Sequence, residues 1–83
     1  MKLVALRPDL RTFLRTRQLV GKWEKAAALF ERDIRHPSLH TELMEPSWYG
    51  MYSFRIDRKY RALFFIKDEG CAEVFTITNH YKK

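Results

Sequence analysis

Residues 51–78, MYSFRIDRKYRALFFIKDEGCAEVFTIT, decide the fold that this sequence predicts. Apolar and polar side chains alternate over residues 51–56, which is typical of a strand with one buried face. Residues 60–67 are almost wholly apolar, as expected of a central strand covered on both faces. Residues 71–78 are rich in β-branched and aromatic side chains and follow a hairpin signal. We therefore predict three antiparallel strands joined by short turns.

The turns between these strands fix a register. A two-residue loop at 68–69 pairs Arg61 with Thr76, and a three-residue turn at 57–59 pairs Arg55 with Arg61. A slip of one residue would send the charged side chains into the core, so burial favours this register. It gathers apolar side chains on one face, where they would pack on helices. The predicted apolar face consists of Tyr52, Phe54, Ile56, Ala62, Phe64, Ile66, Phe75 and Ile77.

The opposite face is predicted to expose Arg55, Arg61 and His80 toward one end of the sheet. Guanidinium groups bind phosphate oxygens and stabilise charge that develops at phosphorus. An imidazole exchanges a proton near neutral pH, and the adjacent Tyr81 could stack on a base or shuttle a proton. This set suits a phosphodiester, although solvated surface charges are the alternative. Arg61 lies in the most apolar strand, where a charge is costly unless it faces a site or a partner.

The segment before the sheet predicts a helical hairpin behind a short edge strand at residues 2–6. Pro8 suits the start of a first helix, whose apolar side chains recur at helical spacing as far as Arg17. Gly21 interrupts, and a second helix with one continuous apolar face covers residues 22–35. The predicted class is α+β in the order β-α-α-β-β-β. The edge strand and the two-helix hairpin would pack on a three- to four-stranded antiparallel sheet.

Length and composition indicate a single domain, residues 1–83. The one cysteine, Cys71, excludes an internal disulfide and a CxxC metal site. No stretch of the sequence is long and apolar enough to span a membrane, and the first residues do not resemble a signal peptide. We therefore expect a cytoplasmic protein with no membrane partner.

The charge of the chain is +6, from sixteen Lys and Arg against ten Asp and Glu. It is concentrated in residues 1–41, which hold nine basic and four acidic side chains. A basic domain of this size favours a nucleic acid or an acidic protein as its partner, and charge kept for solubility is the alternative. The candidate nucleic-acid contacts are Arg11, Arg15, Arg58, Lys59 and Lys82.

Residues 38–50 are predicted to form a loop that carries two further candidates. Glu42 and His40 have side chains that could act as an acid or a base, and simple surface residues are the alternative. His36 could contact the last carbonyls of the second helix. The three histidines lack metal-ligand spacing with Cys or Asp, and no phosphate-binding loop is present. No metal and no cofactor are expected.

Three segments resemble the RelE/ParE superfamily of bacterial toxins from type II toxin–antitoxin systems. They are H36-P37-S38-L39-H40-T41-E42-L43, then Y52-S53-F54-R55-I56-D57-R58-K59-Y60-R61-A62-L63-F64-F65, then I77-T78-N79-H80-Y81. The middle segment is the most specific of the three, and the resemblance extends over residues 1–81. It implies the fold predicted above, a helical hairpin followed by an antiparallel sheet.

The resemblance also implies an activity. RelE-like and YoeB-like members are ribosome-dependent mRNA endonucleases that need no metal and leave a 2′,3′-cyclic phosphate. By similarity, Arg61 would stabilise the transition state, Arg55 would assist it, and the terminal pair His80 and Tyr81 would supply proton transfer and substrate orientation. The sequence departs from YoeB-like members at their loop glutamate, because Pro37 stands at that position. Glu42 and His40 are the loop groups nearest to taking its place.

Other members of the superfamily, of the ParE type, inhibit DNA gyrase without nuclease chemistry. That activity, or a member that is not toxic, is the alternative for this chain. The resemblance further implies an acidic antitoxin encoded beside the toxin, together with the ribosome and mRNA as partners. The basic first half of the chain suits either an acidic protein or ribosomal RNA.

Overall fold

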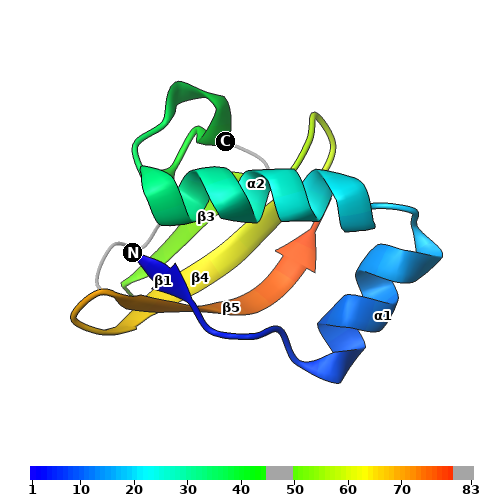
Figure 1. Ribbon diagram of the computed structural model, residues 1–83, viewed down its shortest axis with the longest axis horizontal. Helices are drawn as coiled ribbons and strands as arrows, with labels where there is room; N and C mark the ends of the chain where they lie inside the picture. The colour runs from blue at the N-terminus through cyan, green and yellow to red at the C-terminus, as the bar shows by residue number, and fades with distance from the viewer. Residues whose placement is uncertain (45–49, 80–83) are drawn as a thin grey trace.

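The computed structural model describes residues 1–44 and 50–79. Five strands form one mixed sheet in the order β1-β5-β4-β3-β2 (Figure 1). Two α-helices and one short 3-10 helix complete the fold, and the predicted α+β class and element order are confirmed. The strands are β1 Lys2–Leu3, β2 Glu42–Leu43, β3 Met51–Arg55, β4 Arg61–Asp68 and β5 Cys71–Thr78. The helices are α1 Pro8–Thr16, α2 Val20–Arg32 and η1 Pro37–Leu39.

The sheet is larger than predicted and is not wholly antiparallel. β1 pairs with β5 in parallel, because the chain crosses through both helices before it enters the antiparallel strands. β2 adds a further edge strand beside β3, within residues that the sequence predicts to be a loop. Two-residue strands carry little sequence pattern, which is why β2 gives no periodic signal.

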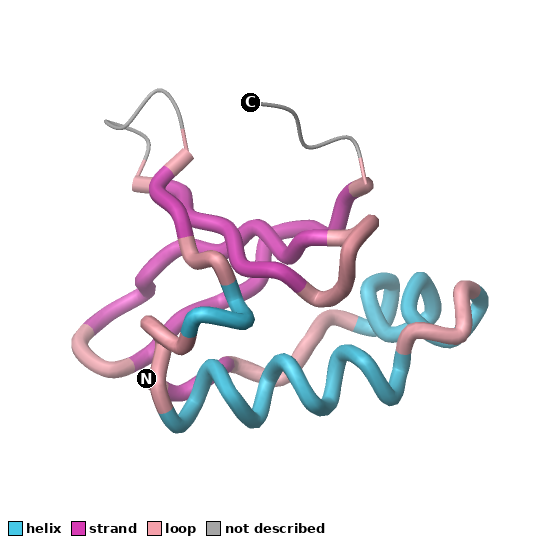
Figure 2. The backbone as a smooth tube through the Cα atoms, turned by 90° about the horizontal axis from the view of Figure 1, so that it is seen from above, coloured by secondary structure: helices cyan, strands magenta, loops and turns pink. Residues whose placement is uncertain are grey.

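The helices and the sheet form two layers (Figure 2). α2 runs across one face of the sheet, and α1 lies beside its end (Figure 1). Phe30 of α2 meets Phe54 and Phe64 with ring centroids 4.8 and 5.0 Å apart, and all three side chains are fully buried. Trp23, two turns before Phe30 in α2, stacks on Phe54. Aromatic packing of this kind carries much of the stability of a small core.

The junction between the two helices differs from the prediction. α1 ends at Thr16, and Gln18 takes a left-handed conformation with φ of 57°. The amides of Gln18 and Leu19 donate to the carbonyls of Arg15 and Leu14, which is a Schellman ending. Gly21 therefore does not separate the helices but lies in the first turn of α2. Buried Leu14 and Leu19 stabilise this ending, so a non-glycine residue is accepted in the left-handed position.

The register of β3 on β4 is as predicted, with Arg55 directly opposite Arg61. The β4–β5 register is not, because Asp68 pairs with Cys71 and Arg61 pairs with Thr78 rather than Thr76. The loop is displaced by one residue so that Gly70, with φ of 78°, takes the left-handed turn position.

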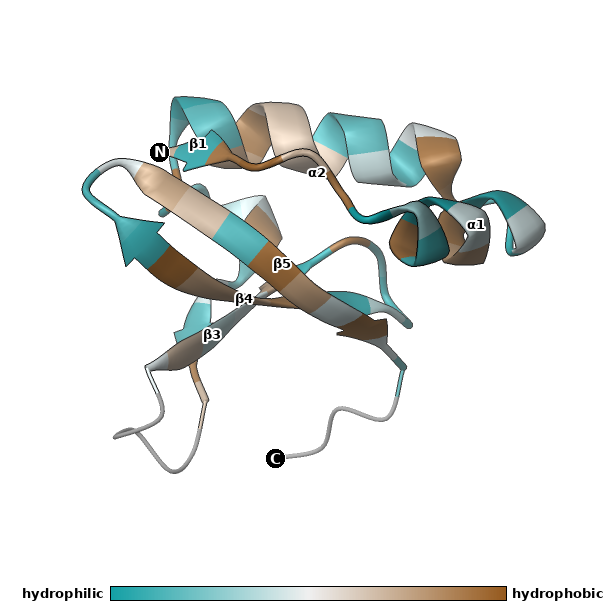
Figure 3. Ribbon diagram, turned by 90° about the horizontal axis from the view of Figure 1, so that it is seen from below, coloured by the Kyte–Doolittle hydropathy of each residue, from teal (hydrophilic) through white to brown (hydrophobic). Residues whose placement is uncertain are grey.

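An irregularity in the β4–β5 pairing changes which side chains of β5 are buried. The register shifts between Leu63 and Phe64, so Phe75 is an additional residue on β5. Val74 is buried as a result, and Phe75 is 52% exposed. Ile66 is also exposed, at 43%, so the prediction that Phe75 and Ile66 lie in the core is wrong. Figure 3 shows the resulting mixture of apolar and hydrophilic residues along β5.

α2 ends at Arg32, earlier than predicted, and the chain turns through Asp33 into η1. The Thr41 hydroxyl donates to the Ile34 carbonyl at 2.7 Å and closes this connection. The connection packs Leu39, which is almost completely buried, against the core. Within residues 1–44 and 50–79, no helix has the length and apolar character needed to cross a membrane.

Candidate functional site

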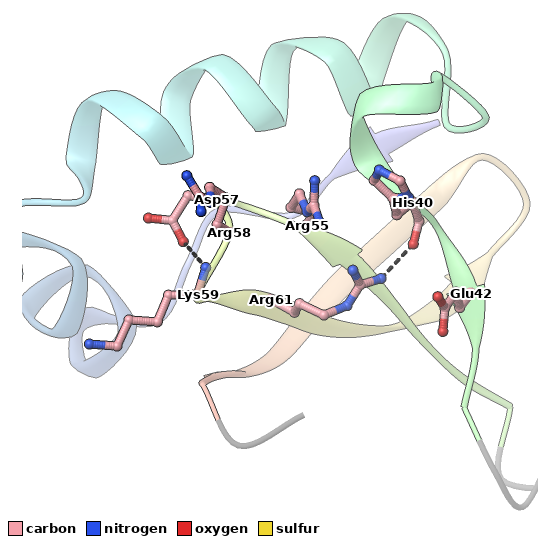
Figure 4. Close-up of a pocket in the computed structure, with 7 residues that line it drawn as sticks. All are labelled: His40, Glu42, Arg55, Asp57, Arg58, Lys59 and Arg61. Atoms are coloured by element: carbon pink, nitrogen blue, oxygen red, sulfur yellow. Dashed lines mark hydrogen bonds between the residues drawn. The ribbon is translucent and has the colours of Figure 1, made fainter. Parts of the chain in front are cut away.

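A polar pocket of about 240 Å³ lies where the η1–β2 connection meets the turn between β3 and β4 (Figure 4). Its walls come from three parts of the chain: the residues after η1, the end of β3 with its turn, and the start of β4. The lining residues are His40, Glu42, Arg55, Asp57, Arg58, Lys59 and Arg61.

Arg61 lines this pocket and is held in place by hydrogen bonds. Its side chain extends from β4 toward His40 and Glu42 (Figure 4). Nε and Nη2 both donate to the Ser53 hydroxyl, at 3.0 and 2.9 Å, and Nη2 also donates to the His40 carbonyl. Arg61 is only 9% exposed and Ser53 is fully buried, so the predicted exposure of Arg61 is wrong. These hydrogen bonds offset the cost of removing a guanidinium group from water.

The local backbone aims the His40 carbonyl at Arg61. His40 follows η1 in a left-handed conformation, with φ of 46° and ψ of 50°. Here the His36 prediction is also corrected, because its Nδ1 accepts the Ser38 amide and caps η1. Arg61 therefore links β4, in the sheet, to the connection between η1 and β2 that contains His40 and Glu42.

Asp57 organises the opposite wall. Its Oδ1 accepts the amides of Lys59 and Tyr60, each at 2.8 Å, and its Oδ2 pairs with Lys22 of α2 at 3.1 Å. Partial burial raises the pKa of Asp57, but the Tyr60 and Lys59 amides and the Lys22 ammonium lower it more. The net pKa lies below its ordinary value of 3.8, so this carboxylate stays charged. The turn that presents Arg58 is thereby held in one conformation.

The structure brings together six of the residues that the sequence singled out. Five are cationic or acidic groups on β2, β3 and β4 or in the turn between β3 and β4, and all six line the pocket: His40, Glu42, Arg55, Arg58, Lys59 and Arg61. In Figure 4 the Lys59 side chain points away from Arg61, while Arg55 points toward α2. Arg11 and Arg15 line a different hollow, between α1 and α2. His80, Tyr81 and Lys82 lie outside the described residues.

Two neighbours of this set were missed by sequence reasoning. Ser53 supports Arg61, and its position two residues before Arg55 on the same strand face was the available signal. Lys22 reaches the turn from α2, and only the tertiary fold shows that contact.

The charges that line the pocket favour binding of an anion. Four of its lining residues are Arg or Lys, and two are Asp or Glu. Arg55 and Arg61 are directly opposed on neighbouring strands, and both line this pocket. The same pocket holds an imidazole and a carboxylate, which are the usual groups for proton transfer. Among the described residues, no three His, Cys, Asp or Glu side chains are grouped to hold a metal ion.

Solved structures share this architecture over nearly the whole chain. The YoeB/ParE toxin from Agrobacterium tumefaciens matches with a TM-score of 0.71 at 24% identity, covering 98% of this chain and 100% of that chain. The YoeB dimer from Staphylococcus aureus matches with a TM-score of 0.70 at 16% identity, covering 96% and 94%. A chain of the heterotetrameric YoeB–YefM toxin–antitoxin complex from the same organism matches with a TM-score of 0.68 at 18% identity, covering 96% and 94%.

These matches establish the fold. The chain shares the fold of these YoeB and YoeB/ParE toxin structures, as the resemblance of its sequence motifs predicted. Neither a scan of the sequence against protein-family models nor a search of curated proteins finds a match.

Proposed function

We propose that this chain is the toxin of a type II toxin–antitoxin module and that it cleaves mRNA on the ribosome without a metal. The observation that carries the proposal is the pair of opposed arginines, Arg55 and Arg61, in a pocket that also holds an imidazole and a carboxylate. A phosphodiester fits this set because its charge grows in the transition state, and fixed guanidinium groups stabilise that growth. The shared fold with YoeB toxins supports the same activity class.

The reaction requires one proton to leave and one to arrive. The ribose 2′-oxygen loses its proton to a base and forms a bond to phosphorus, while the bond from phosphorus to the 5′-oxygen breaks. That leaving oxygen takes up a proton from an acid, and the product end is a 2′,3′-cyclic phosphate. Arg61 and Arg55 would hold the phosphate oxygens, and Glu42 or His40 would act as the base. His80 is proposed as the acid and Tyr81 as the group that orients the base ring, both by family resemblance.

The experiment is induced expression followed by mapping of mRNA ends on ribosomes. Wild type should produce cuts within translated codons. Arg55→Ala should lower cleavage by about 100-fold, the usual effect of losing a group that stabilises transition-state charge. Glu42→Gln distinguishes the two loop candidates, because it should abolish cleavage only if Glu42 is the base. Arg32→Ala, at the exposed end of α2, is the matched control and should cleave like wild type. Equal cleavage by Arg55→Ala and wild type would contradict the site assignment.

Two observations favour a second function. Arg61 is engaged by Ser53 and His40 as a structural brace, and Pro37 stands where YoeB-like members carry a glutamate. A ParE-like gyrase inhibitor would need no base there. Induction that triggers a DNA-damage response while translation continues would support this alternative against the nuclease.

We further propose a cytoplasmic protein that is held inactive by an acidic antitoxin. One similar structure is a heterotetrameric complex of the YoeB–YefM toxin–antitoxin from Staphylococcus aureus. A chain of +6 net charge suits an acidic partner. The test is a small acidic reading frame beside the gene, whose product should co-purify with this chain and block cleavage.

A further inference from the structure

We propose that the pocket continues onto α2, where Lys22 and Lys25 bind backbone phosphates of the same RNA strand beyond the bond that is cleaved. This inference rests on the proposed nuclease function and extends its substrate contacts. Neither lysine belongs to the set that the sequence predicted to bind nucleic acid.

The geometry that carries the inference is a second hollow of about 290 Å³ between α2 and the end of β3. Lys22 and Lys25 line it, and it shares Arg55 and Asp57 with the first pocket. Arg55 points from β3 toward α2, at the boundary of the two hollows (Figure 4). An occupant of the first pocket can therefore extend past Arg55 without leaving the protein surface.

The charge of the combined surface suits a polyanion rather than a single phosphate. Across the two hollows the lining includes six Lys or Arg side chains and two Asp or Glu side chains. Lys22 and Lys25 are three residues apart on α2, so they project on the same side of the helix, about 5–6 Å apart at Cβ. Both are exposed and can follow a flexible strand.

Lys22 can exchange its present partner for a phosphate at little cost. Its ion pair with Asp57 is at the surface, with the Lys22 side chain 61% exposed, and such pairs contribute about 0–1 kcal/mol. Asp57 keeps its two amide hydrogen bonds when Lys22 leaves, so the turn remains organised.

The basic residues of α1 that line a hollow, Arg11 and Arg15, do not adjoin the first pocket. Arg11 and Arg15 line a separate hollow between α1 and α2, together with Leu14, Val20 and Trp23. That hollow shares no lining residue with the pocket that holds Arg55 and Arg61. Arg32 and Arg35, which are exposed and line neither of the two joined hollows, provide a control with the same loss of charge.

The test measures binding of a single-stranded RNA oligonucleotide, blocked by 2′-O-methyl groups against cleavage, to the full chain across a salt series. Lys22→Ala/Lys25→Ala should weaken binding by about tenfold, and each lost phosphate contact should reduce the salt slope by about 0.7. Lys22→Arg/Lys25→Arg should restore the slope, and Arg32→Ala/Arg35→Ala should leave it unchanged. Helicity, measured by circular dichroism, should be equal in all variants because the substituted sites are exposed.

Two outcomes would overturn the inference. If Lys22→Ala/Lys25→Ala binds like wild type, or if Arg32→Ala/Arg35→Ala loses as much, the extension onto α2 is wrong while the nuclease proposal stands. If wild type neither binds the RNA nor cuts mRNA on ribosomes, the proposed function fails and the inference fails with it.

Discussion

Two of the hollows lined by basic residues differ in how their charges are held in place: the sheet pocket, which contains Arg61, and the helical hollow between α1 and α2. In the sheet pocket, Arg61 is buried and hydrogen-bonded to Ser53 and His40, so its position is fixed. In the helical hollow, Arg11 and Arg15 are exposed cations on the rim of apolar walls. A fixed charge stabilises a transition state because no reorganisation is needed when the charge develops. This difference shows that the candidate reaction centre is identified by the burial and hydrogen bonding of its cations, rather than by their number.

The largest difference between the two hollows should be in the effect of a substitution on the free energy of unfolding. Arg61→Ala removes the donors that the buried Ser53 hydroxyl and the His40 carbonyl accept from, and it leaves a cavity. Buried acceptors without donors cost about 1–3 kcal/mol, so we expect a loss of about 2–4 kcal/mol in the free energy of unfolding. Arg11→Ala should change it by less than about 0.5 kcal/mol. Urea denaturation of both variants checks this, and equal stabilities would show that Arg61 is not a brace.

Ser53→Ala should give the next largest effect. The guanidinium group of Arg61 loses the oxygen that accepts from Nε and Nη2, which should cost about 1–2 kcal/mol of stability. The cleavage rate at saturating ribosomes should also fall, while the affinity for ribosomes is kept, because only the orientation of Arg61 changes. Ser38→Ala, at an exposed serine of η1, is the control. A Ser53→Ala protein that is unstable but cleaves normally would separate folding from positioning.

Asp57→Asn should lower stability by about 1 kcal/mol at neutral pH, because the charged acceptor and the ion pair with Lys22 are lost. The pKa of Asp57 is depressed in the folded state, so its contribution is complete above the unfolded value and disappears as pH falls through the folded one. The difference between the two proteins should be constant from about pH 7 to 5 and should shrink below 3.8. Unfolding curves at several pH values measure it, and a difference that persists in acid would exclude the carboxylate charge as its cause.

The sequence predicted the parts of this molecule that depend on local periodicity. The three long strands, both helices and the Arg55–Arg61 pairing follow from alternation, helical spacing and a short turn. It did not predict the β4–β5 register, because one glycine moved the turn and an extra residue entered β5. The burial of Arg61 was missed for a different reason: the η1–β2 connection that covers it is distant in sequence.

The smallest effect concerns the helix junction. Gln18 adopts a left-handed conformation, which glycine adopts without steric cost. Gln18→Gly should therefore raise the free energy of unfolding by about 0.5 kcal/mol. The gain is small because glycine also gives the unfolded chain more conformational freedom. Gly21→Ala in the first turn of α2 is a companion variant, because an added Cβ there meets nothing within 4 Å. Thermal unfolding measures both, and a destabilised Gln18→Gly would argue against the Schellman ending.

The central claim is that the sheet pocket, and not the helical hollow, is the reaction centre. The most direct measurement is the single-turnover rate of mRNA cleavage on purified, programmed ribosomes, with Arg55→Ala compared against Arg11→Ala. We predict that Arg55→Ala cleaves about 100-fold more slowly than wild type and that Arg11→Ala retains its rate. An unchanged rate for Arg55→Ala, with or without a loss for Arg11→Ala, would contradict the claim.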